Sequence, residues 1–167
     1  MTTEIFYSHI KTIKEALENN DLAIFVGSGV SHCTAPDKYP LWTPICNELK
    51  ADLSTDENDS LKIAQLYQLE FKPLKTKKRI QSMFPSVDVP GQLQRKILDL
   101  NPHYIITTNW DKLFDNEINN NADLYDIIVD DKSLVESTSD CKYIKMHGDF
   151  DHNNYVFNED DYIIFLY

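Results

Sequence analysis

Three short segments of this chain carry residue types that could bind a nucleotide and act on it. They are G-S-G-V-S at residues 27–31, T-T-N-W-D at 107–111 and K-M-H-G-D at 145–149. The first offers glycine backbone and hydroxyl groups for a phosphate, the second an amide and a carboxylate, and the third a histidine. Each follows a run of apolar residues typical of a strand buried in a parallel sheet. Because ligands bind at the carboxyl ends of such strands, the three segments predict a single site.

In the first segment, Gly27 and Gly29 would let the backbone turn tightly and approach a pyrophosphate with no side chain between them. Ser28 and Ser31 would add hydroxyl donors. The segment lacks the third glycine of the dinucleotide fingerprint and has no Walker lysine, which argues against an oxidoreductase and an NTPase. Taken alone, it is equally consistent with a strand-to-helix turn that binds nothing.

In the second segment, Asn109 could hold a ribose hydroxyl or a water molecule beside a reacting sugar. It could also simply turn the backbone. Asp111 is a sound N-cap for a following helix, which is a structural alternative to a role in binding. We expect Trp110 to pack in the core.

In the third segment, His147 follows a strand and has an ordinary pKa near neutral, as a general base requires. Gly148 lets the backbone bend after it. A strand-end histidine that is hydrogen-bonded to a loop is the alternative. The other four histidines lack this context, and none forms an H-x-x-x-H or H-E-x-x-H pattern.

Hydrophobic periodicity predicts the elements that position these segments. Thr43 is the expected N-cap of the helix that begins at Pro44, and Asn158 with Asp161 is expected to cap the last helix. The expected helices are 3–19, 44–53, 60–71, 74–83, 92–100, 111–118 and one from 159; the expected strands are 22–26, 104–107, 124–129, 142–146 and a short one at 155–157. Apolar strands that alternate with helices predict an α/β three-layer fold with a mostly parallel sheet.

Composition narrows the function classes. The 167 residues suffice for one domain with its own core, and a net charge of −11 disfavours direct nucleic-acid binding. The three cysteines have no zinc spacing and fit a reducing compartment. The N-terminus lacks a signal peptide, and apolar runs are too short to span a membrane. We therefore expect a soluble cytoplasmic domain without a metal site.

Together, the ordered segments resemble the sirtuin-like domains of bacterial antiphage defence proteins. Those domains carry a G-A-G-V-S-like turn, a T-T-N-[YW]-D turn and an H-G turn in this order. Pro40-Leu41-Trp42 is similar to their P-x-W, and residues 159–162 are similar to their E-D-Y. The resemblance extends from about Asp21 to Tyr162, which is most of the chain.

The resemblance implies a Rossmann-like NAD site in which the glycine turn faces the pyrophosphate. Asn109 and His147 match the catalytic asparagine and histidine, and Asp111 matches the carboxylate on the nicotinamide side. The residues expected to bind NAD are Gly27, Ser28, Gly29, Ser31, Thr108 and Asp111. The implied reaction is hydrolysis of NAD, the substrate, to nicotinamide and ADP-ribose without a metal. A homo-oligomer or a C-terminal or partner sensor domain would gate this effector.

Two departures from the family pattern limit these expectations. The chain lacks the paired cysteines and the Phe-Arg pair of protein-deacylating sirtuins, so deacylation is disfavoured. Related domains also continue to a further glycine/serine turn on the adenosine side, and no such turn occurs before Tyr167. Residues 1–167 are therefore expected to be the N-terminal portion of a sirtuin-like domain, or else to form an incomplete site. A non-catalytic sensor of NAD or ADP-ribose is the main alternative function.

Overall fold

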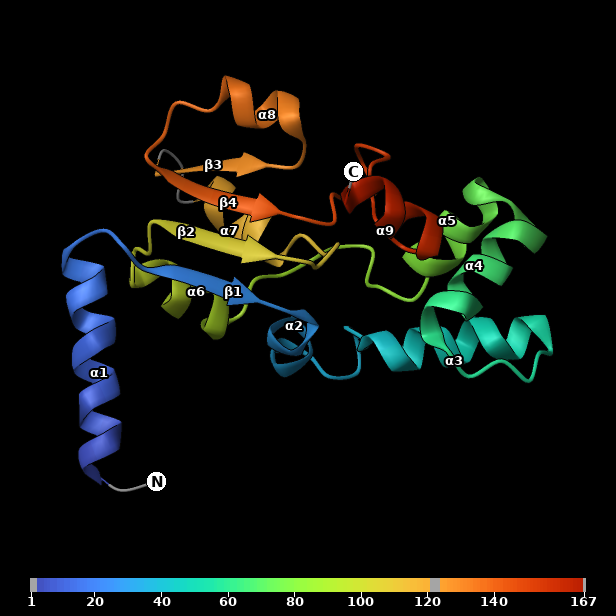
Figure 1. Ribbon diagram of the computed structural model, residues 1–167, viewed down its shortest axis with the longest axis horizontal. Coiled ribbons are helices and arrows are strands. Elements are labelled where there is room, and N and C mark those ends of the chain that lie inside the picture. Colours follow the sequence, from blue (N-terminus) through green and yellow to red (C-terminus); the bar gives the residue numbers. More distant parts are fainter. Residues whose placement is uncertain (1–2, 121–123, 167) are drawn as a thin grey trace.

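A four-stranded parallel sheet lies at the centre of the fold (Figure 1). The computed structural model describes residues 3–120 and 124–166. The strands β1 (Ala23–Val26), β2 (Tyr104–Thr107), β3 (Tyr125–Ile128) and β4 (Cys141–Lys145) are arranged in the order β1-β2-β4-β3. The prediction of an α/β fold with a parallel sheet is confirmed.

The register of the sheet aligns the ends of three neighbouring strands. Val26 of β1 pairs with Thr107 of β2, which in turn pairs with Lys145 of β4. The three sequence segments therefore leave the sheet side by side, at one edge and at one level.

One face of the sheet is covered by helices α2 (Ser28–Thr34), α6 (Gln92–Asp99) and α7 (Leu113–Asn120). Alternate strand residues point into this layer, as the two-residue period of a strand requires. The core between them contains Val26, Ile105, Phe114, Ile118, Tyr125, Cys141 and Tyr143.

The opposite face is covered only in part by the described residues. Phe25, Ile106 and Ile144 lie in register across it, and Phe25 is 61% exposed. The short helix α8 (Asp131–Glu136), which the sequence patterns do not predict, contacts β3 but contributes no buried residue. An apolar strip therefore remains over β1 and β2.

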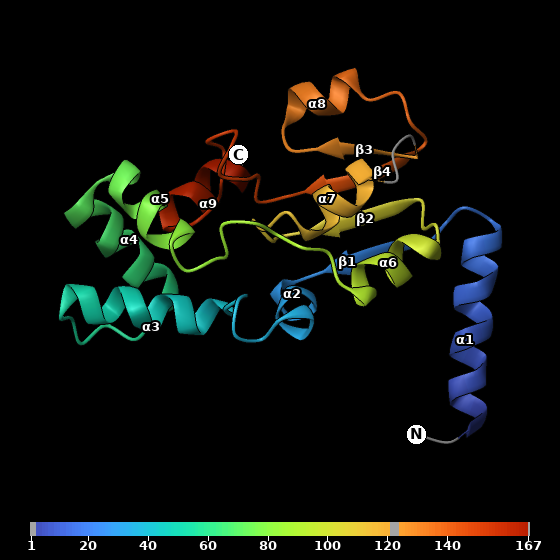
Figure 2. The ribbon, with the colours of Figure 1, turned by 180° about the vertical axis from the view of Figure 1, so that it is seen from behind.

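A second group of helices lies beyond the carboxyl ends of the strands (Figures 1 and 2). It comprises α3 (Trp42–Leu53), α4 (Ser60–Phe71), α5 (Pro73–Gln81) and α9 (Glu159–Leu166), with α4 in contact with the other three. These helices share a separate core that includes Ile45, Leu49, Ile63, Tyr67, Ile80 and Phe157. Their position leaves the functional segments between this helical group and the sheet.

Helix α1 (Thr3–Glu18) projects from the other end of the sheet (Figure 1). Its apolar residues Ile5, Phe6, Ile10 and Ile13 are all exposed. Among the described residues, no helix combines the length and apolar character needed to cross a membrane.

Two predicted helix starts were wrong by two residues. Helix α3 begins at Trp42 with Leu41 as its N-cap, so Thr43 is not the cap. Pro44 then occupies the first turn, where its missing N–H breaks no intrahelical bond. Helix α7 begins at Leu113 rather than at Asp111.

The predicted strand at 155–157 was also wrong. Val156 makes one ladder-like bond, from its N–H to the carbonyl of His147 at 3.0 Å, while Phe157 is held by aromatic packing. The predicted cap of the last helix is confirmed: Asp161 N–H donates to Asn158 Oδ1 at 3.0 Å, and Asn158 N–H donates back to Asp161 Oδ2 at 3.2 Å.

Candidate functional site

A cavity of about 150 Å³ lies between the carboxyl edge of the sheet and the helical group. Six of the eight residues expected at the site line it: Ser28, Ser31, Thr108, Asn109, Asp111 and His147. The remaining two, Gly27 and Gly29, flank these in the first segment. Apolar and aromatic residues line the opposite wall, among them Trp42, Ile45, Phe84, Trp110, Phe157 and Tyr162. The cavity is thus polar on the sheet side and apolar on the helical side.

A chain of buried hydrogen bonds links the first and second segments. Asn109 Nδ2 donates to Ser31 Oγ at 3.0 Å, and Ser31 Oγ donates to Asp111 Oδ2 at 2.7 Å. Because all three side chains are at least nine-tenths buried, water competes little for these bonds. The amide and the carboxylate are therefore held in fixed positions by one serine hydroxyl.

The side chain of Thr107 fixes the backbone at Asn109. The Thr107 hydroxyl donates to the carbonyl of Val26 at 2.9 Å and accepts the N–H of Asn109 at 3.0 Å. Thr107 is fully buried. A single side chain thus ties the turn after β2 to the end of β1.

Asp111 both lines the cavity and bonds to the backbone at the start of α7. Its Oδ1 accepts the N–H of Leu113 at 3.2 Å, at the start of α7, while its Oδ2 accepts the Ser31 hydroxyl. Burial raises the pKa of this carboxyl, and the hydrogen bonds from Ser31 and Leu113 oppose the shift only in part. The carboxyl can therefore hold a proton at higher pH than an exposed aspartate does.

His147 is half-buried and also lines the cavity. Its ring packs edge-to-face against Tyr162 of α9, with ring centroids 5.2 Å apart. Burial lowers the pKa of His147, which favours the neutral ring that can accept a proton.

The two glycines of the first segment leave open space beside the backbone, but neither adopts a conformation that other residues avoid. Gly27 has φ −110°, which any residue adopts, and Gly29 lies within α2. A Cβ atom added at either position would meet no protein atom within 4 Å. The chain does turn directly from β1 into α2 here, but neither glycine needs a conformation that other residues avoid, and the open approach to the backbone is present.

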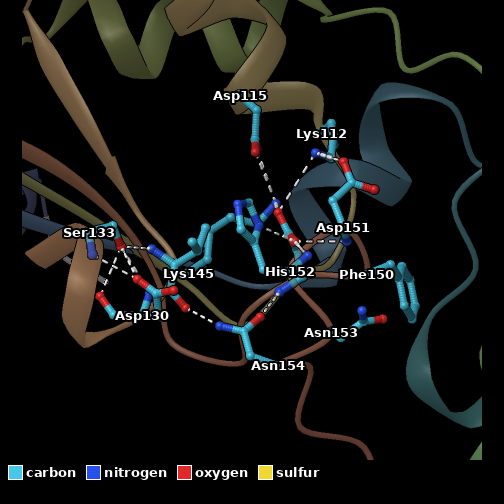
Figure 3. A network of polar contacts seen from close by, with 12 residues as sticks. Lys112, Asp115, Asp130, Ser133, Lys145, Phe150, Asp151, His152, Asn153 and Asn154 are labelled. Carbon is cyan, nitrogen blue, oxygen red and sulfur yellow. Dashed lines mark hydrogen bonds and ion pairs between the residues drawn. The ribbon is translucent and has the colours of Figure 1, made fainter.

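Sequence reasoning missed a buried charged cluster beneath the cavity. The Lys145 side chain is fully buried and donates to both carboxylate oxygens of Asp115, at 3.1 and 3.2 Å. Asp149 lies 3.8 Å away and is itself buried. In Figure 3, the side chains of Lys145, Asp115 and Lys112 point toward a common centre. The two-residue period of β4, in which Cys141 and Tyr143 face the core, could have predicted that Lys145 is buried.

The aromatic wall was only partly anticipated. Trp42 packs edge-to-face with Trp110 and with Phe157, at centroid distances of 6.2 and 5.9 Å. Trp110 therefore packs against the core of the helical group, as expected, but it is only partly buried and also lines the cavity.

The described residues contain no group of three or more His, Cys, Asp or Glu side chains placed to hold a metal ion. Of the three cysteines, Cys33 is exposed and Cys46 and Cys141 are buried, and all are free thiols.

Comparison with known proteins agrees with this arrangement. The SIR2-like domain family matches residues 103–167, which contain the second and third segments. The chain is also 33% identical, over 168 aligned positions that cover 92% of it, to Defense-associated sirtuin 2 of Bacillus subtilis. The chain therefore carries a match to the SIR2-like domain, and most of its length is similar to a defence-associated sirtuin. The chain spans 16% of the length of that Bacillus relative.

Proposed function

We propose that this chain forms the site at which an antiphage defence protein cleaves NAD to nicotinamide and ADP-ribose. The observation that carries the proposal is the convergence of Asn109, Asp111 and His147 on one partly buried cavity. The defence role is supported by the name of the Bacillus relative, Defense-associated sirtuin 2.

The residues around the cavity fit the parts of NAD. The open space beside Gly27 and Gly29 admits a phosphate close to the backbone, and Ser28 supplies a hydroxyl. The aromatic wall suits a flat ring. The two carboxylate oxygens of Asp111 accept from Ser31 and Leu113 and have further lone pairs that could accept the N–H groups of a carboxamide. A cavity of about 150 Å³ is smaller than the roughly 300–1,000 Å³ typical of small-molecule pockets, so it would enclose only part of the dinucleotide.

The proposed chemistry rests on two residues. When bound, NAD supplies a glycosidic bond whose cleavage passes through an oxocarbenium-like sugar. Asn109 donates its Nδ2 to Ser31, so its Oδ1 is the atom that would orient a ribose hydroxyl or the attacking water. His147 would take the proton from that nucleophile, since the burial that lowers its pKa favours the neutral ring.

We further propose that the activity is gated by self-association or by a sensor domain. The chain accounts for 16% of the length of its Bacillus relative, so the relative has ample sequence for other domains. A constitutively active NAD hydrolase would deplete the NAD of the cell that produces it.

The test is nicotinamide release from NAD by the wild-type protein and by Asn109→Ala and His147→Ala. We expect both variants to lose at least about 100-fold in kcat, the lower range for a general acid–base group. Asn47→Ala and His9→Ala are matched controls, because both side chains are exposed and neither residue lines the cavity, so their replacement should leave turnover unchanged. Circular dichroism melting would verify that each variant is folded.

Three outcomes would contradict the proposal. Full turnover in either site variant would refute the role of that residue. Calorimetric binding of NAD without nicotinamide release, under conditions where the defence function is triggered, would indicate a sensor. Nicotinamide release that requires an acetyl-lysine peptide would indicate a deacylase.

A further inference from the structure

We propose that Lys145 is a positioning residue, which fixes the Asn109 and His147 segments relative to each other through its buried ammonium group. This inference rests on the proposed NAD-cleaving function. No atom of Lys145 lines the cavity, so its effect would be exerted through the residues it holds.

The ammonium group joins three parts of the chain. Lys145 Nζ donates to the backbone carbonyl of Asp111 at 3.0 Å, in the turn that carries Asn109. It donates to Asp115 on α7, and it lies 3.8 Å from Asp149 Oδ2, in the turn that carries His147. Lys145 is itself the last residue of β4, two positions before His147.

The cost of burying the Lys145 ammonium group makes this connection sensitive to the positions of its partners. Moving an ammonium group out of water costs several kcal/mol, and the cost is repaid only when the partners are well placed. The side chains of Lys145, Asp115 and Asp149 are 0%, 7% and 1% exposed. A shift of either turn would leave a buried charge without its partner, so the cluster favours one relative position of the two turns.

The outer side of the cluster is closed by a second cation. Lys112 Nζ lies 3.7 Å from Asp149 and contacts Asp151 at the surface. Asp149 Oδ1 also accepts the backbone N–H groups of Asp151 and His152, at 2.9 and 3.0 Å. Burial alone would raise the pKa of Asp149, but the His152 hydrogen bonds and the two lysine charges lower it overall. The turn after His147 is thus anchored to Asp149, and Asp149 faces Lys145.

Replacing Lys145 alone would be uninformative, because the buried carboxylate of Asp115 would lose the cation it pairs with and the protein would be strongly destabilised. The informative variant is Lys145→Met with Asp115→Leu, which exchanges this ion pair for apolar side chains of similar size, while Asp149 keeps Lys112 and the backbone N–H groups of Asp151 and His152. Such exchanges are often neutral for stability. A second variant, Lys145→Gln with Asp115→Asn, keeps neutral hydrogen-bonding groups if the apolar pair fails to fold.

We expect the double variant to melt within a few degrees of the wild type and to bind NAD with a similar Kd, yet to lose about 100-fold in kcat, the effect of a displacement near 1 Å. The control is Arg79→Met with Asp52→Leu, an ion pair between α5 and α3 whose removal should leave kcat unchanged. Wild-type kcat in a folded double variant would show that the cluster is only structural and would overturn the inference.

Hydrogen exchange provides a readout that does not depend on activity. The amides of Asn109 and Leu113 should exchange faster in the double variant than in the wild type, although the global stability is the same. Unchanged exchange at these amides would overturn the inference, even if the wild type proved inactive on NAD. Wild-type inactivity with faster exchange in the variant would instead refute the proposed function alone.

Discussion

The hydroxyl of Ser31 donates to the carboxyl of Asp111 across 2.7 Å, although the two residues are 80 positions apart in the sequence. This bond places a residue of the glycine segment among the groups we propose for glycosidic cleavage. The glycine segment therefore contributes to the reacting end of the cavity as well as to phosphate binding.

Replacement of Ser31 by alanine should test its contribution to the reacting end of the cavity. Ser31→Ala removes the common partner of Asn109 and Asp111 and should cost about 1–3 kcal/mol in stability, because two buried polar groups lose a hydrogen bond. If the same energy is lost in the transition state, kcat falls by about 5- to 160-fold. Steady-state kinetics and denaturant unfolding would measure both effects. Ser86→Ala, in an exposed loop, is the matched control, and wild-type kcat in Ser31→Ala would argue against a role for the Asn109–Ser31–Asp111 chain in the chemistry.

The pH dependence of NAD cleavage should have an acidic limb set by His147. A general base acts in its neutral form, and burial lowers the pKa of His147 from its ordinary value of about 6.5. The rate should therefore be constant near neutral pH and fall as the pH drops through the lowered pKa. A profile of kcat/KM between about pH 4 and pH 8 would show this limb.

Asp111 could produce a limb in the same range, because burial raises its pKa. The variant Asp111→Asn keeps a side chain that can accept from Ser31 but does not titrate. The acidic limb should persist in the residual activity of this variant. Its disappearance would assign the limb to Asp111 and not to His147.

The glycines of the chain should respond to alanine in opposite ways. Gly29→Ala should stabilise the protein by roughly 0.5–1 kcal/mol, because the residue is helical and its Cβ would meet open space. The same methyl group would occupy the space proposed for the phosphates, so NAD should bind about tenfold more weakly, a loss of about 1.4 kcal/mol. Gly27→Ala should weaken binding similarly without a gain in stability.

Gly148→Ala is the contrasting control for these variants. Gly148 has φ +59°, and a Cβ there would collide with the backbone and side chain of Asn154. The left-handed conformation alone should cost roughly 1–2 kcal/mol. Isothermal calorimetry and thermal melting would measure these differences, and undiminished NAD affinity in Gly27→Ala and Gly29→Ala would place the phosphates elsewhere.

The sequence predicts the strand ends well, because four apolar strands followed by turn residues leave little choice of boundary. Residues 104–107 form β2 as predicted, and Asn158 and Asp161 cap α9 as predicted. Local patterns of this kind depend only on neighbouring residues. They could not show that Asn109 and Asp111 would both bond to the Ser31 hydroxyl, because those contacts require the pairing of β1 and β2.

Long-range burial also explains what the sequence could not predict. Lys145 is recognisable as strand-terminal, but only the fold shows that Asp115 and Asp149 surround it. Residues 155–157 have the apolar character of a strand, yet Phe157 is held by Trp42 and Trp110 of the helical group. The sequence patterns predict the helices of this group one by one, but they do not predict that the helices pack together over the cavity.

The apolar strip on the second face of the sheet has a consequence for handling the protein. Phe25, Ile106 and Ile144 give the described part of the chain a patch of the kind through which proteins associate. A net charge of −11 keeps copies apart at low ionic strength, because like-charged molecules repel one another. Added salt screens that repulsion while leaving the attraction between apolar strips intact, so dilute buffers should preserve dispersed samples and concentrated salt should promote clustering.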